Sequence, residues 1–240
     1  FDGVGIYVDS DSSVGTITNS GTITTSADND AYGIFVDDDS TVDTITNSGT
    51  ITASADTANA FGIHVSDTST VGTITNSGTI TASVGVDNAY GIHLDTNVSV
   101  GTLTNSGTIT ASAGEDDAVG IYIVDSSTIA TFNNTGTISV TAGIKEATGI
   151  LVSSESTITT LTNSGLIEAI SLGGDANGID MQDDDATGIN TITTLTNTGT
   201  ISGSAAVSIG RGVNLDEQSL IISLDNQGLI QGAAGATYGR

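Results

Sequence analysis

The sequence predicts an all-β protein: a right-handed parallel β-helix, or β-solenoid, of about eight coils with three short strands in each coil. Two markers that return mostly every 29 residues, as from Asn47 to Asn76, carry this prediction. The first is the asparagine of segments such as TITNSGTIT, found at Asn19, Asn47, Asn76, Asn105, Asn134, Asn163, Asn197 and Asn226. The second is the glycine of segments resembling Gly-Ile-x-Val, found at Gly5, Gly33, Gly62, Gly91, Gly120, Gly149, Gly178 and Gly212. A fixed repeat of this size is typical of solenoids, in which each coil contacts only its neighbours.

The composition favours strands over helices. Thr, Ser, Gly, Asn, Ile and Val are abundant among the 240 residues, and these β-branched and turn-forming types suit strands joined by tight corners. Proline is absent, as expected where every backbone N–H joins a ladder. We expect residues 1–240 to form a single solenoid segment, excised from a longer chain.

The elements of one coil can be followed in order over residues 31–59. Alternating apolar and polar residues predict strands, and Gly and Asx residues predict the corners between them. The expected order is a strand over 32–36, a polar turn over 37–40, a strand over 42–46, a corner over 47–49, a strand over 50–53 and a loop over 54–59. Equivalent strands of successive coils then stack about 4.8 Å apart.

One coil is longer than the others. Nineteen positions separate Gly178 from Asn197, against 14 between Gly149 and Asn163, so five residues are inserted. We expect them to form a bulged loop near residues 181–188.

Charge and cysteine content exclude several classes of function. The formal net charge is −25, with only Lys145, Arg211 and Arg240 as cations, so no basic surface is available for nucleic acid or an anionic membrane. No cysteine is present for disulfides or thiolate chemistry. No apolar run approaches the ~20 residues of a membrane-spanning helix.

Stacking turns each repeat position into a column of side chains. The eight marker asparagines face inward, so we expect a structural ladder of amide hydrogen bonds rather than a catalytic site. A second column, beside the glycine marker, faces outward and forms a candidate interaction stripe: Tyr7, Phe35, His64, His93, Tyr122 and Leu151. Exposed rings could dock a partner, or they could stack across coils and stabilise the sheet.

Metal and cofactor binding is not expected. The only two histidines, His64 and His93, lie in adjacent coils, but no third ligand is obvious from the sequence. The turns that follow the first strand of each coil are acidic, which leaves weak surface Ca²⁺ binding open. The acidic residues of these turns are Asp9, Asp11, Asp37, Asp38, Asp39, Asp67, Asp95, Asp125 and Glu155.

Two other functions receive little support. Outward Thr-x-Thr pairs such as Thr44/Thr46 and Thr50/Thr52 resemble the ice-binding faces of some solenoid antifreeze proteins, but β-branched residues also simply favour strands. Catalysis has no Ser-His-Asp spacing or phosphate-binding loop to support it. Paired aspartates leave a glycosidase open, and a unique site should interrupt the repeat, as the 181–188 loop and the adjacent Asp180 do.

With the repeats aligned, segments such as LTNSGTI followed by Gly-Ile-x-Val resemble the passenger region of bacterial autotransporters over essentially the whole chain. The resemblance implies a secreted, β-helical, cysteine-poor rod on the outer-membrane surface of a Gram-negative bacterium. Its membrane contact would come only through a C-terminal barrel that this segment lacks.

We therefore expect a non-enzymatic, structural and adhesive solenoid that binds host or cell-surface ligands or other copies of itself. The main alternative is a subunit that stacks end to end into an extracellular filament, because coil ends carry unpaired strand edges. Ice binding is a remote third hypothesis.

Overall fold

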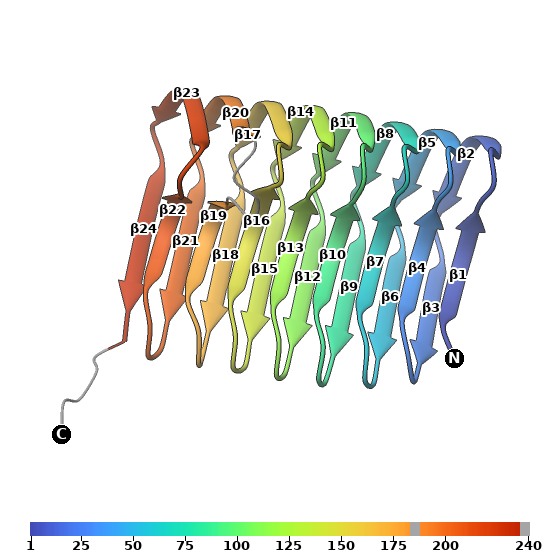
Figure 1. Cartoon of the computed structure of the whole chain (residues 1–240), viewed down its shortest axis with the longest axis horizontal. Helices are drawn as coiled ribbons and strands as arrows, with labels where there is room; N and C mark the ends of the chain where they lie inside the picture. Colours follow the sequence, from blue (N-terminus) through green and yellow to red (C-terminus); the bar gives the residue numbers. More distant parts are fainter. Residues whose placement is uncertain (183–187, 236–240) are drawn as a thin grey trace.

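The computed structural model describes residues 1–182 and 188–235, and it confirms the predicted fold class. Within these residues, 24 strands form three parallel sheets of eight strands each. Figure 1 shows the coils side by side along the long axis, with the N-terminal coil at one end and the C-terminal coil at the other. The described residues contain no helix, and so none that could cross a membrane.

Each coil gives one strand to each sheet. The first sheet contains β1 (Gly3–Val8), β4 (Ala31–Val36), β7 (Ala60–Val65), β10 (Ala89–Leu94), β13 (Ala118–Ile123), β16 (Ala147–Ser153), β19 (Ala176–Gln182) and β22 (Gly210–Leu215). The second contains β2 (Ser13–Asn19), β5 (Thr41–Asn47), β8 (Thr70–Asn76), β11 (Ser99–Asn105), β14 (Thr128–Asn134), β17 (Thr157–Asn163), β20 (Asn190–Asn197) and β23 (Ser219–Asn226). The third contains β3 (Thr22–Ala27), β6 (Thr50–Ala55), β9 (Thr79–Val84), β12 (Thr108–Ala113), β15 (Thr137–Ala142), β18 (Leu166–Ser171), β21 (Thr200–Ala205) and β24 (Leu229–Ala234).

The strands pair in the register that the repeat predicts. In the second sheet Ile45 lies opposite Ile74, and Asn47 lies opposite Asn76. The strands also run slightly longer than predicted. For example, β6 was expected to end at residue 53 but continues to Ala55. The inserted loop expected near 181–188 falls largely on residues 183–187, which lie outside the described part of the chain.

The core is a narrow stack of aliphatic layers between the three sheets. Ile34, Ile45 and Ile51, one from each strand of the coil at 31–59, are completely or almost completely buried. Equivalent positions in the inner coils carry Ile, Leu or Val, apart from Phe132. Because no single coil could bury these side chains alone, each coil depends on its neighbours for stability.

The marker glycine interrupts the alternation of the first strand in each coil. Tyr32 and Phe35 lie three positions apart, yet their rings stack on the outer face while Ile34 is buried between them. A Cβ atom on Gly33 would overlap Cγ2 of Ile51 and the carbonyl oxygen of Gly62. A side chain at this position would therefore force the neighbouring coil and the core apart.

The acidic turns after these strands have left-handed backbone conformations. Asp38 and Asp39 have φ angles of 55° and 59°, and Asp67 and Thr68 have φ angles of 48° and 58°. Asp and Asn adopt this conformation more readily than most other residues with a side chain, because their short polar side chains can hydrogen-bond locally. The left-handed turn conformation therefore explains part of the repeated occurrence of aspartate in these turns.

Candidate functional site

The eight marker asparagines form one continuous hydrogen-bonded column. Asn47 Nδ2 donates to Asn76 Oδ1 at 2.8 Å and to the carbonyl oxygen of Thr79 at 3.0 Å. The same side-chain link joins every consecutive pair, from Asn19 to Asn226, at 2.7–2.9 Å. The amides of the inner coils are fully buried, so the column satisfies their polar groups and ties each coil to the next.

The outer face of the first sheet carries two columns of rings, and we call this surface the ring face. One column includes the six residues of the candidate interaction stripe. The other column, Tyr32, Phe61 and Tyr90, was missed by the sequence analysis, because the break at the marker glycine brings residues three apart onto one face. Neighbouring rings stack with centroids 4.7–5.8 Å apart.

The stripe is less exposed than the sequence suggested. Tyr7 in the first coil is 51% exposed, but His64, His93 and Leu151 are only 8% exposed. The prediction of an exposed row is wrong for these three residues. Side chains of the adjacent columns cover the rings, as Phe61 does for both histidines, so the geometry here is that of cross-coil stacking.

The two histidines have no polar partner within the stack. Among the described residues, no group hydrogen-bonds to Nδ1 or Nε2 of either His64 or His93. Burial lowers the pKa of His64 to about 4, although the charge of Asp37 opposes this shift. Burial, and then the neighbouring His64, hold the pKa of His93 well below its ordinary value. Both imidazoles are therefore neutral at physiological pH.

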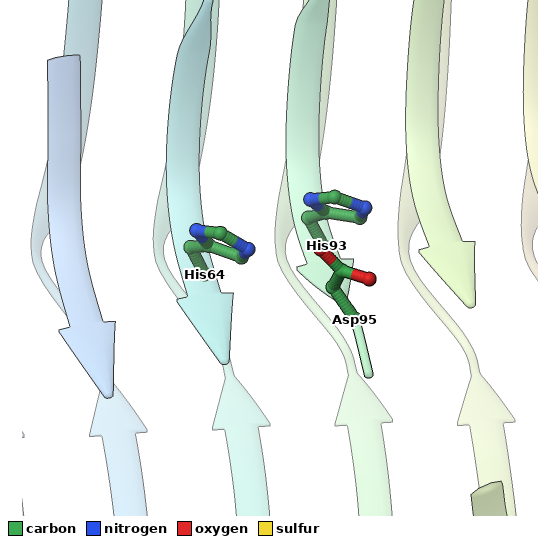
Figure 2. A group of neighbouring side chains, drawn as sticks. All are labelled: His64, His93 and Asp95. Atoms are coloured by element: carbon green, nitrogen blue, oxygen red, sulfur yellow. The ribbon is translucent and has the colours of Figure 1, made fainter. Parts of the chain in front are cut away.

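Asp95 lies beside this pair. Figure 2 shows the two imidazole rings nearly parallel on adjacent strands, with the carboxylate of Asp95 next to His93. One possible ligand atom from each of the three residues can be chosen so that all lie within 4.8 Å of one another. The repeat pattern assigns Asp95 to the acidic turns, and no spacing in the sequence connects it with the histidines.

Farther along the ring face, the rings give way to two neighbouring acidic residues, the partly buried Glu146 and the fully buried Asp180, which we call the acid pair. Asn177 Nδ2 donates to Glu146 Oε1 at 2.5 Å and to Asp180 Oδ2 at 2.8 Å. Asn214 Nδ2 donates to Asp180 Oδ1 at 2.9 Å, and Gln182 Nε2 donates to Asp180 Oδ2 at 3.1 Å. Asp180 was predicted as part of a possible site from the interruption of the repeat, whereas Glu146, which belongs to the preceding coil, was not predicted.

The pKa values of both members of the acid pair are raised. Burial raises the pKa of Glu146 to about 8, and the hydrogen bond to Asp180 and the charge of Asp180 raise it further in the same direction. Burial also raises the pKa of Asp180, against the opposing effect of its hydrogen bonds with Asn214 and Glu146. Both shifts have the same direction, so the pair keeps a proton to higher pH than free carboxyl groups do.

A pocket of about 220 Å³ opens between the rings and Glu146. Tyr90 and Tyr122 line one part, Glu146 and Gln182 line another, and Asp117, Val119, Thr148 and Leu151 complete the lining. Small side chains at Val119 and Thr148 replace the rings of the earlier coils, which makes room for the pocket. The pocket therefore combines aromatic surface with carboxyl and amide groups.

The other surfaces of the rod are more uniform. In the second sheet Thr44 pairs with Thr73, and Thr46 pairs with Thr75, so the threonine columns are aligned as the repeat predicts. Ice binding by these columns stays a prediction. The acidic turns lie in successive coils, and within the described residues they form no carboxylate group as close as the one that contains the histidines.

Comparison with known proteins assigns neither a family nor a function to this chain. No family model, curated protein or solved structure matches this chain. The resemblance to autotransporter passengers therefore remains a hypothesis based on the repeat, and only the solenoid fold is established.

Proposed function

We propose that this chain is a non-enzymatic, structural and adhesive β-solenoid of the autotransporter-passenger type, exposed at the outer-membrane surface of a Gram-negative bacterium. The uninterrupted stacking supports the structural role. Acidic residues outnumber basic ones by 28 to 3, which supports an exposed and soluble rod that does not bind nucleic acid.

The observation that carries the adhesive role is the change along the ring face. The second sheet repeats threonine through most of its coils, whereas the first sheet changes from stacked rings to carboxyl and amide groups. In a repeat protein, positions that depart from the repeat are not explained by stacking alone. The pocket lies at this transition and offers a partner both apolar contact and hydrogen bonds.

The acid pair supports a binding role more than catalysis. Glycosidases hold their two carboxyl groups at least about 5 Å apart, which leaves room for the reacting centre. Glu146 Oε1 and Asp180 Oδ2 are instead bridged by a single donor, Asn177 Nδ2, at 2.5 and 2.8 Å. These contacts use the carboxyl groups to order the pocket wall.

Binding of the labelled 240-residue chain to mammalian cells and to immobilised extracellular-matrix proteins tests the adhesive role. Asp117→Asn and Gln182→Ser change the pocket, and equivalent coils already contain Asn88 and Ser153 at these positions. We expect saturable binding that the double variant weakens by about fivefold or more, equivalent to about 1 kcal/mol. Thr44→Ser on the second sheet is the matched control and should bind as the natural chain does.

Two results would contradict the adhesive role: no saturable binding to any of these surfaces, or equal binding by the double variant and the natural chain. Surface display has a separate test. Antibodies against the segment should label intact cells of the source bacterium, and labelling only after lysis would contradict the proposed location.

End-to-end assembly is the second candidate. In the eighth coil Leu220, Ile222, Leu224 and Leu229 are 43–62% exposed. A further coil, from the same chain or from another copy, would cover part of this apolar surface. Negative-stain imaging across a range of protein concentrations should show fibres if copies stack, whereas short rods at every concentration would contradict the filament.

A further inference from the structure

His64 and His93 are the only histidines of the chain, and they lie opposite each other on β7 and β10. Both side chains are more than nine-tenths buried. Within the described residues, all four of their ring nitrogens lack a hydrogen-bond partner. Burying polar atoms in this way is unfavourable unless something satisfies them.

Stacking alone does not require histidine at these positions. Phe35 occupies the same column in the preceding coil, and its ring stacks on His64 with centroids 4.9 Å apart. A phenylalanine has no polar atom to leave unsatisfied. Two adjacent histidines, where phenylalanine would stack equally well, therefore indicate a role for the ring nitrogens.

We propose that His64, His93 and Asp95 bind one divalent first-row transition metal ion, such as Zn²⁺, with solvent completing the coordination. The three side chains lie together on the ring face, and their ligand atoms lie within 4.8 Å of one another. Imidazole nitrogen with carboxylate oxygen is a ligand set typical of Zn²⁺, whereas Ca²⁺ takes oxygen ligands alone. This site is therefore distinct from any Ca²⁺ binding at the acidic turns, and it does not depend on the proposed adhesive role.

Coordination requires the two rings to tilt. Tetrahedral Zn²⁺, with bonds of 2.0–2.2 Å, places its ligand atoms roughly 3.3–3.6 Å apart. The rings stack at 4.8 Å with an interplanar angle of 11°, so their in-plane lone pairs are nearly parallel. Rotation about the side-chain torsions brings one nitrogen of each ring toward the ion. Binding therefore also changes the packing of the neighbouring Tyr90 and Tyr122.

Titration of the full 240-residue chain with Zn²⁺ by calorimetry tests the site, with millimolar Ca²⁺ present to compete at exposed carboxylates. The variants His64→Phe and His93→Phe keep a ring in the stack, as Phe35 does one coil earlier. Asp95→Ser introduces the residue that precedes it in its column, Ser66. Asp43→Asn, on the second sheet, is the control for loss of one remote carboxylate.

We expect one Zn²⁺ per chain and a loss of about tenfold or more in affinity for each His→Phe variant. Asp95→Ser should weaken binding less, and Asp43→Asn should leave it unchanged. Titration of the natural chain with Co²⁺ should give visible absorption bands of nitrogen-containing coordination and a change in the near-ultraviolet dichroism of tyrosine. Because the Co²⁺ titration uses the natural chain, it tests the site even if a variant fails to fold.

The proposal is overturned if the natural chain takes up no Zn²⁺, or if a variant lacking all three side chains binds it equally well. A Co²⁺ spectrum of oxygen-only octahedral coordination would overturn it as well, because the ion would then lie on surface carboxylates.

Discussion

Replacing Asn105 by Ala breaks the asparagine column in the middle of the rod. The Asn105 side chain is fully buried. Its Nδ2 donates to Asn134 Oδ1 at 2.8 Å and to the carbonyl oxygen of Thr137 at 3.2 Å. Its Oδ1 accepts from Asn76 Nδ2 at 2.9 Å. The substitution therefore removes three hydrogen bonds across two interfaces between coils.

The magnitude follows from the groups left behind. Asn134 Oδ1 loses its donor from the column, while Asn76 Nδ2 keeps its bond to the carbonyl oxygen of Thr108 at 3.1 Å. Each buried group left without a partner costs about 1–3 kcal/mol, so we expect a total loss of about 2–4 kcal/mol in the free energy of unfolding. Asn226→Ala is the matched control. Because Asn226 is exposed at the last coil, water can replace its bonds and the loss should stay below about 1 kcal/mol.

Urea denaturation followed by far-ultraviolet circular dichroism measures both variants. The double variant Asn76→Ala/Asn105→Ala should lose less than the sum of the single losses, because the two residues share a hydrogen bond. Equal losses for Asn105→Ala and Asn226→Ala would refute the reasoning, since the buried column would then contribute no more than an exposed amide.

Three further predictions concern the close approach of coils, the acid pair and the stacked histidines. Gly91→Ala should destabilise the protein by about 1–3 kcal/mol in urea, because its Cβ would overlap Ile109 and Gly120, whereas Gly21→Ala meets no atom within 4 Å and should change stability by less than about 0.5 kcal/mol. Folding raises the pKa of Glu146 from 4.5 to about 8, so its stabilising contribution is present below pH 4.5 and is lost as the pH rises to about 8. The free energy of unfolding measured in urea should fall over this window by at most about 1.4 kcal/mol per pH unit, reduced by partial solvent exposure, and Glu146→Gln should flatten the dependence. With a metal chelator present, His93→Phe should raise the unfolding free energy by about 1–2 kcal/mol, because it removes two unsatisfied buried nitrogens without removing the ring.

Each of these predictions has a clear contrary result. Equal effects of the two glycine substitutions would show that coil spacing does not exclude a side chain. A pH dependence with the same slope in Glu146→Gln would assign it to other carboxyl groups. A loss of stability in His93→Phe would show that the nitrogens are already satisfied.

The repeat period predicts most of the fold, because in-register stacking converts sequence spacing directly into spatial contact. The inward positions of Ile45, Asn47 and Ile51 follow from simple alternation, and all three are buried. The period also predicts that Ile45 lies opposite Ile74.

The features of the ring face were harder to predict for three different reasons. The second ring column was missed because the break at Gly33 places Tyr32 and Phe35 on one face. Asp95 was assigned to a turn, but it directly follows strand β10, and its side chain therefore lies near His93. The acid pair requires a diagonal contact between different columns of adjacent coils, which a column-by-column alignment does not reveal.

Nuclear Overhauser contacts in the labelled chain test the central claim, that side chains one repeat apart stack in register. The structure predicts contacts that join Ile74 to Leu103 and Leu103 to Phe132, together with amide contacts between successive asparagines of the column. A spectrum that instead joins consecutive strands of one coil as antiparallel hairpins would contradict the solenoid and every inference drawn from its columns.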